Sequence, residues 1–305
     1  MQKPSLIDVT LRDGEQTPGV AFSTREKVFI SRLLDRLGVY QIEAGIPAMG
    51  EIEQQAIRSI LALGLRCRVS TWNRMVLEDV KASLACGVKD LHVSAPVSSL
   101  HIRYKLGRSR AWVLRRMKEV LRYALSYGCS VTVGAEDASR AEESFLAEFS
   151  LTARDAGAQR LRYCDTVGVL DPFSTFNRIS RLREETPIPL EFHGHNDFGM
   201  ATANALAALK AGCTYIDVTV GGLGERAGNT SLEELAAALG GIYGIEPVLG
   251  SRALWLLGHY VSRAANRGNP ASFLAAERPA IHRVWPASCR RRPYYASLLP
   301  WRRVF

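Results

Sequence analysis

The sequence lacks an apolar run long enough to cross a membrane, and its N-terminus lacks the charged-then-apolar pattern of a secretory signal. No Cys-x-x-Cys pair occurs among its dispersed cysteines, which are Cys67, Cys86, Cys129, Cys164, Cys213 and Cys289. Such spacing favours single core thiols in a reducing compartment over a disulfide framework or a zinc knuckle. We therefore expect a cytoplasmic protein with no membrane partner.

Acidic residues are scarce in the C-terminal segment. Residues 246–305 hold ten Arg, no Lys and only two acidic residues, so they carry +8 of the net charge of +9. A basic tail can bind nucleic acid, but no nucleic-acid-binding motif accompanies this one, and we do not expect such a partner. From about Glu277 onward the hydrophobic periodicity disappears. We interpret this end as truncated or frame-shifted, with a genuine basic extension as the alternative.

The rest of the chain alternates strand-like and helix-like segments about thirty residues apart, a spacing typical of βα units. Eight strands are predicted, at residues 6–12, 40–44, 67–71, 90–94, 130–135, 160–164, 190–195 and 215–220. Helices are predicted between them, among others at residues 24–37, 51–63, 111–127, 141–156, 172–185 and 200–211. An early Gly-rich dinucleotide fingerprint is missing, which argues against the alternative, a doubly wound sheet. The pattern predicts an α/β protein with a (β/α)8 TIM barrel over residues 1–245, followed over residues 246–305 by a partial helical region and an irregular basic tail.

Two histidines in the seventh predicted strand indicate a metal site. His193 and His195 are two residues apart, so in a strand both imidazoles point to the same face. Asp13, after the first strand, offers a carboxylate. Two nitrogens and one oxygen, with positions left open, are typical of a catalytic centre for Mg, Mn, Zn or Fe. Asn229 either completes the shell, directly or through water, or only forms loop hydrogen bonds.

The ends of the other strands supply further candidates, because catalytic groups of TIM barrels lie at the C-terminal ends of the strands. Arg12 and Asp13 are expected to end the first strand, Glu136 follows the fifth and Thr166 the sixth. Arg12 is predicted to stabilise a developing oxyanion, or to pair structurally with Glu43. Gln16 is predicted to reach substrate oxygens or to cap the following turn.

Three segments carry a resemblance to a known family: residues 11–20, 192–197 and 222–229. Together they resemble the metal-dependent acyl-CoA carboligases and lyases built on a TIM barrel, which include 2-isopropylmalate, homocitrate and citramalate synthases and hydroxymethylglutaryl-CoA lyase. The resemblance runs from about Ser5 to about Gly244. Residues 19–22, 71–74 and 198–204 look most like the homocitrate synthases that supply the nitrogenase cofactor. The lyase branch has a cysteine in the loop at residues 221–228, and this chain has none there.

The resemblance implies an acyltransferase that condenses acetyl-CoA with 2-oxoglutarate, in a metal-dependent Claisen-type reaction, to give homocitrate and CoA. It implies that Arg12 and Glu136 are catalytic and that Gln16 and Thr166 contact substrate. Residues 136–140 resemble the segment of homocitrate synthases whose arginine binds the distal carboxylate of 2-oxoglutarate, so Arg140 is predicted to select the diacid. An exposed helix start is the alternative for Arg140.

A homodimer is also expected from the resemblance. Synthesis of 2-isopropylmalate or citramalate is the alternative activity. A remnant that binds metal and oxoacid without turnover is the alternative of another class.

Overall fold

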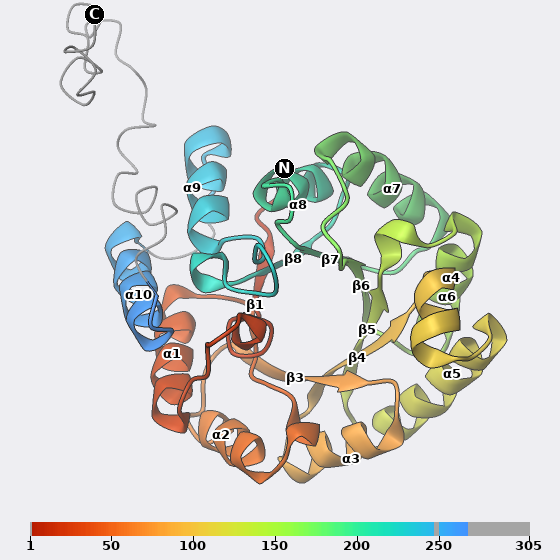
Figure 1. Ribbon diagram of the computed structural model, residues 1–305, viewed down its shortest axis with the longest axis horizontal. Helices are drawn as coiled ribbons and strands as arrows, with labels where there is room; N and C mark the ends of the chain where they lie inside the picture. The colour runs from red at the N-terminus through yellow and green to blue at the C-terminus, as the bar shows by residue number, and fades with distance from the viewer. Residues whose placement is uncertain (1, 247–249, 268–305) are drawn as a thin grey trace, which may run out of the picture.

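Eight parallel strands close into one barrel in chain order, β1 to β8 (Figure 1). The structure is a computed structural model that describes residues 2–246 and 250–267. The prediction of a TIM barrel is confirmed. The predicted irregular tail beyond residue 267 lies outside the described residues.

All eight predicted strands form, although their ends differ from the predicted ones by up to four residues, most at the end of β1. Their bounds are β1 (Ser5–Asp8), β2 (Gln41–Glu43), β3 (Arg68–Arg74), β4 (Asp90–Pro96), β5 (Ser130–Glu136), β6 (Arg160–Asp165), β7 (Leu190–Gly194) and β8 (Tyr215–Val218). The sheet closes because β1 pairs with β8 as well as with β2.

Helices surround the barrel (Figure 1). They are α1 (Thr24–Leu37), α2 (Glu51–Leu61), α3 (Leu77–Ala85), α4 (Ser99–His101), α5 (Arg110–Ser126), α6 (Glu143–Asp155), α7 (Pro172–Glu185), α8 (Ala201–Lys210), α9 (Leu232–Tyr243) and α10 (Ser251–Ala264). Two predicted helices, α1 and α7, have the expected bounds because their ends carry strong signals. Ser23 and Glu26 form a reciprocal capping box before α1, and Asp171 caps α7 just before a proline.

The buried residues of the barrel form two regions of different character, one between the strands and the helices and one enclosed by the strands. Between strands and helices the core is apolar, with residues such as Val93, Val133 and Phe149 fully buried. The centre of the barrel holds buried charged side chains instead, because alternate strand residues point inward. These residues include Glu43, His92, Arg160, Arg162, Glu191 and Asp217. A polar centre in a closed barrel is expensive to desolvate and is a sign of function at one end of it.

The last described helix, α10, packs against α1 and against the loop that follows β8 (Figure 1). In the described part of the chain, none of the helices combines the length and the apolar character that a bilayer span requires.

Candidate metal centre and active site

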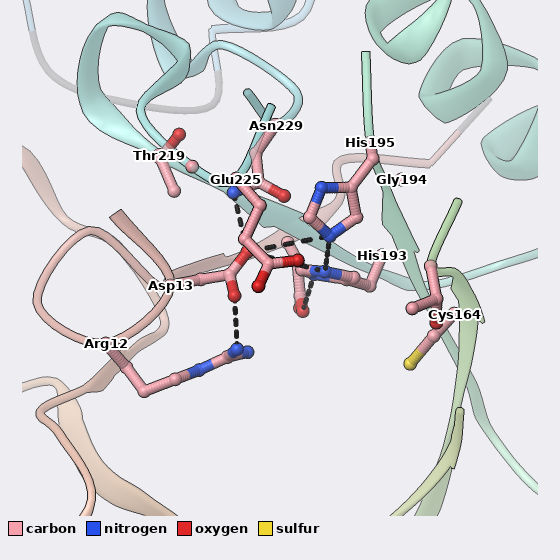
Figure 2. A network of polar contacts seen from close by, with 12 residues as sticks. Arg12, Asp13, Cys164, His193, Gly194, His195, Thr219, Glu225 and Asn229 are labelled. Atoms are coloured by element: carbon pink, nitrogen blue, oxygen red, sulfur yellow. Dashed lines mark hydrogen bonds and ion pairs between the residues drawn. The ribbon is translucent and has the colours of Figure 1, made fainter. Parts of the chain in front are cut away.

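Asp13, His193 and His195 meet at the C-terminal end of the barrel (Figure 2). Nε2 of His193 lies 3.1 Å from Nε2 of His195. Oδ2 of Asp13 lies 3.6 Å from the first nitrogen and 3.8 Å from the second. The point equidistant from these three atoms is about 2.0 Å from each, which is the length of a bond from Zn²⁺ or Mg²⁺ to nitrogen or oxygen. The three side chains therefore fit a divalent cation.

The protonation states of these side chains also suit a cation. Burial lowers the pKa of His193 to about 4, and burial together with His193 lowers the pKa of His195 to about 4. Burial alone would raise the pKa of Asp13, but the Arg12 guanidinium and the two imidazoles outweigh it and bring this pKa to about 2. At neutral pH the triad thus presents two neutral imidazoles and one carboxylate.

A tight turn after β1, rather than the strand itself, positions Asp13. The sequence predicted a strand through Arg12, but β1 ends at Asp8. The Asp8 carboxylate accepts a hydrogen bond from the backbone N–H of Thr10, and the carbonyl of Val9 accepts from the N–H of Asp13 at 2.8 Å. These local bonds compete with strand pairing and turn the chain over the barrel mouth.

The two histidines are held differently. His193, on β7, has its Nδ1 3.0 Å from Oδ2 of Asp217 on β8. A carboxylate on the outer nitrogen fixes the ring and leaves Nε2 free for a ligand bond. His195 lies one residue beyond β7 and forms an isolated bridge with Asn229.

Asn229 contacts the triad through Asp13. Its Nδ2 donates to Oδ2 of Asp13 at 2.6 Å and to the carbonyl of Leu223 at 2.9 Å. Its Oδ1 is buried and has no hydrogen-bond partner in the part of the chain that the structure describes. An orphaned buried oxygen on a residue that contacts Asp13 adds to the fit for a cation, since such atoms are normally satisfied.

Arg12 is held in the barrel mouth by acidic partners on both sides. It donates to Asp13 and, through Nε and Nη2 at 3.2 and 3.1 Å, to Oε1 of Glu43. Glu43 is fully buried and also accepts from Arg162 and contacts His92. The predicted pairing of Arg12 with Glu43 is thus present, and it leaves the guanidinium on the wall of the cavity described next.

A cavity of about 370 Å³ opens above the triad and contains most of the predicted site. The residues that line it include Arg12, Asp13, Gln16, Glu136, Thr166, His193 and His195. Glu136 accepts from Lys105 at 2.7 Å and contacts Nδ1 of His101 at 2.9 Å. Thr166 accepts the backbone N–H of Asp137, a residue with positive φ at the end of β5.

Two predicted site residues do not line this cavity: Asn229, which contacts the triad through Asp13, and Arg140. The contacts of Arg140 are local. Its guanidinium donates to the buried carboxylate of Asp137 at 2.8 Å and lies 3.2 Å from Nε2 of His101. About a third of its side chain is exposed. The local ion pair with Asp137 takes up the Nε and Nη2 donors of Arg140.

Sequence reasoning missed several residues on the cavity wall, namely Trp72, His92, Ser94, His101, Lys105, Arg162, Cys164, Val167, Glu225 and Arg226. Arg226 has positive φ and donates to Asp197 and to the carbonyl of Thr166, so it ties the glycine-rich loop after β8 to the loops after β6 and β7. Strained residues of this kind cluster at functional sites, but their φ values are not visible in a sequence. Arg160 and Arg162 on β6 left a signal in the sequence, because two arginines alternate with apolar residues in a buried strand.

A barrel with a two-histidine, one-carboxylate centre at its C-terminal end defines a metal-dependent TIM-barrel enzyme. Residues 3–256 match the HMGL-like family model, and the chain belongs to this family, which is metal-dependent. It is 48% identical to 2-isopropylmalate synthase 2 of Caldanaerobacter subterraneus over 88% of this chain and 70% of that protein. It is also 48% identical to homocitrate synthase 1 of Nostoc sp., over 88% of this chain and 72% of that protein.

Solved structures agree on the fold. Hydroxymethylglutaryl-CoA lyase from Pseudomonas aeruginosa superposes with a TM-score of 0.78 over 90% of this chain and 96% of the lyase, at 23% identity. The family resemblance and the enzyme class expected from the sequence are therefore confirmed.

Proposed function

We propose that this protein condenses acetyl-CoA with 2-oxoglutarate and that water then hydrolyses the thioester of the adduct, giving homocitrate and CoA. The observation that carries the proposal is the triad of Asp13, His193 and His195 in a cavity whose wall also contains the Arg12 guanidinium. The triad would hold a divalent cation, with Mg, Mn, Zn and Fe as the candidates, and that cation would polarise the ketone of a 2-oxoacid as a Lewis acid. The homocitrate synthases among the relatives support the choice of product.

Arg12 provides the fixed positive charge in this mechanism. Carboxylates on both sides, Asp13 and Glu43, orient its guanidinium before substrate arrives. A donor held in place at the cavity wall stabilises the oxyanion that forms as the carbonyl is attacked, without reorganising in the reaction. Gln16 and Thr166, on the same cavity, orient the substrate oxygens.

Glu136, which lines the same cavity, holds or moves a proton. Its Oε1 lies within 2.9 Å of both Lys105 and His101, so a proton can be shared among the three groups. Removal of a proton from the acetyl methyl group needs a positioned base, commonly worth about 10²–10⁴-fold in rate. We assign that proton to Glu136.

The expected cytoplasmic homodimer stays a prediction. Asn229 is proposed as an additional ligand or as the residue that orients Asp13, since its amide bonds that carboxylate.

Product analysis tests the proposal. Purified protein freed of metal with a chelator is given each divalent cation in turn, with acetyl-CoA and 2-oxoglutarate. Thiol release is followed, and the acid product is identified by mass. We expect release of CoA and homocitrate in equal amounts, only with metal and 2-oxoglutarate present.

Two other outcomes are informative. The 48% identity to a 2-isopropylmalate synthase makes 2-oxoisovalerate the second candidate substrate, and pyruvate the third, through the putative citramalate synthases among the relatives. Turnover with either, and none with 2-oxoglutarate, would replace homocitrate as the product. Tight binding of metal and oxoacid without CoA release would favour a remnant that has lost turnover.

A further inference from the structure

Arg162, on β6, has a hydrogen-bond donor with no partner on the floor of the cavity. Its side chain is fully buried and still lines the cavity. Its Nε donates to Glu191 and lies 3.1 Å from Asp217, and its Nη1 donates to Glu43 at 2.9 Å. Among the described residues, nothing accepts from Nη2. A buried guanidinium nitrogen left without an acceptor costs free energy and calls for an explanation.

The acidic partners of Arg162 are all shared with other groups. Glu43 also accepts from Arg12, Glu191 also pairs with Arg160 at 2.5 Å, and Asp217 also contacts His193. Arg162 thus has no carboxylate of its own and keeps the capacity to bind another anion.

Polar side chains surround Arg162 at its level of the barrel. Its register partner on β5 is Gly134. A Cβ at position 134 would lie 2.3 Å from Nε2 of His92 and 3.0 Å from Oγ of Ser94. Both side chains line the same cavity. The missing side chain at Gly134 therefore lets His92 and Ser94 pack at this level of the barrel, so that polar side chains line the floor of the cavity beside Arg162.

The metal triad and this cation are close enough for one small molecule. Asp217 contacts both, since its Oδ2 lies 3.0 Å from Nδ1 of His193 and 3.1 Å from Nε of Arg162, and both His193 and Arg162 line the same cavity. A 2-oxoacid whose keto end is at the triad would extend its chain toward the floor.

We propose that Nη2 of Arg162 binds the distal carboxylate of a dicarboxylic 2-oxoacid and so determines the choice of substrate. The inference rests on the proposed function and replaces the role predicted for Arg140, whose guanidinium is already paired with Asp137. A monocarboxylic 2-oxoacid leaves the Nη2 donor unpaired, and a site built around a buried donor rejects such a ligand strongly.

The test compares two ligands of equal chain length. 2-Oxoglutarate and 2-oxovalerate both have five carbons, and only the first has a distal carboxylate. Calorimetry on metal-loaded protein gives both dissociation constants, and their ratio measures recognition of that carboxylate. The test variant is Arg162→Gln. Arg140→Ala and Lys105→Ala are the control variants, because each removes a more exposed cation, and we call these two the rim variants.

We expect the native protein to prefer 2-oxoglutarate by at least about 10²-fold, since a charge-assisted hydrogen bond is lost with 2-oxovalerate. In Arg162→Gln this preference should fall to within a few-fold of unity, while 2-oxovalerate binds as in the native protein, which shows that the barrel and the triad are intact. Arg140→Ala and Lys105→Ala should keep the preference.

Retention of the preference in Arg162→Gln, or its loss in either rim variant, would overturn the proposal. If Arg162→Gln does not fold, loss of the preference in Arg140→Ala or in Lys105→Ala would still overturn the proposal, because it would assign the carboxylate to that cation instead of Arg162. Failure of the native protein to bind any 2-oxoacid would instead sink the proposed function. Tight binding of 2-oxoglutarate with unchanged selectivity in Arg162→Gln would contradict only the role of Arg162.

Discussion

Metal affinity should stay nearly constant as the pH is lowered from 7.5 to 5.0, although two histidines form most of the site. The reason is that His193 and His195 have pKa values of about 4, lowered mainly by burial, and Asp13 has a pKa of about 2. None of these side chains gains an appreciable charge in that range. Protons therefore do not compete with the cation until the pH approaches 4.

The magnitude follows from the two histidines. With an ordinary pKa of about 6.5, protonation at pH 5.0 would weaken the contribution of each imidazole by about 30-fold, so two would cost about 10³-fold in affinity. With pKa values of about 4, only about a tenth of each ring is protonated at pH 5.0, and the loss is below about twofold.

Isothermal titration of the metal-free protein with Mn²⁺ or Zn²⁺ at several pH values measures this directly. Repeating it at pH 5.5 in two buffers with different ionisation enthalpies counts the protons released, and we expect almost none from the histidines. His195→Ala, which removes a ligand atom, serves as the control that the heat comes from this site. A fall of about 10³-fold, with about two protons released, would refute the account of buried neutral imidazoles.

Further predictions concern single residues. His195→Ala should lose bound metal and activity together, and full metal content by atomic spectroscopy would contradict its role as a ligand. Arg12→Lys should keep the bound metal and lower kcat by about 10²–10³-fold, the usual effect of losing a donor that stabilises an oxyanion. An unchanged kcat would exclude this role for Arg12. Gly224→Ala places a Cβ 2.2 Å from Nδ2 of Asn229 and should displace the amide that holds Asp13. Calorimetry should then show weaker metal binding, although Asp13, His193 and His195 are unchanged. An unchanged metal affinity would mean that Asn229 does not orient the site. The pKa of His193 is lower in the folded protein than in the unfolded chain, so the unfolded state binds more protons between pH 6.5 and 4. As the pH falls through this range, the metal-free protein should lose up to about 3 kcal/mol of its free energy of unfolding for this residue alone. Urea denaturation measures this loss, and a stability that does not change with pH would contradict the pKa of about 4.

The barrel was predictable because local signals agree with the global fold. The capping box at Ser23, the cap and proline at Asp171 and the left-handed glycine at Gly38 mark helix ends that the structure reproduces. The end of β1 was predicted four residues too late, because the sequence continues with apolar residues while hydrogen bonds to Asp8 and Val9 already form a turn.

The candidate site was predictable where the residues needed follow directly from the strand order, as for Asp13 and His193. The role of a residue was not predictable where a neighbouring side chain on the same short segment binds it. Arg140 lies three residues after Asp137, and the positive φ of Asp137 brings its carboxylate within reach of that guanidinium. Arg162 was missed for a different reason, because an arginine in a buried strand gives no indication of how many of its donors are satisfied.

Diffraction from crystals loaded with Mn²⁺ and 2-oxoglutarate, recorded where manganese scatters anomalously, tests the central claim most directly. We predict one anomalous peak about 2 Å from Oδ2 of Asp13 and from Nε2 of His193 and His195, with the keto and carboxylate oxygens of the oxoacid beside it. A peak bound by other side chains, or an oxoacid in the cavity with no metal at the triad, would contradict the account.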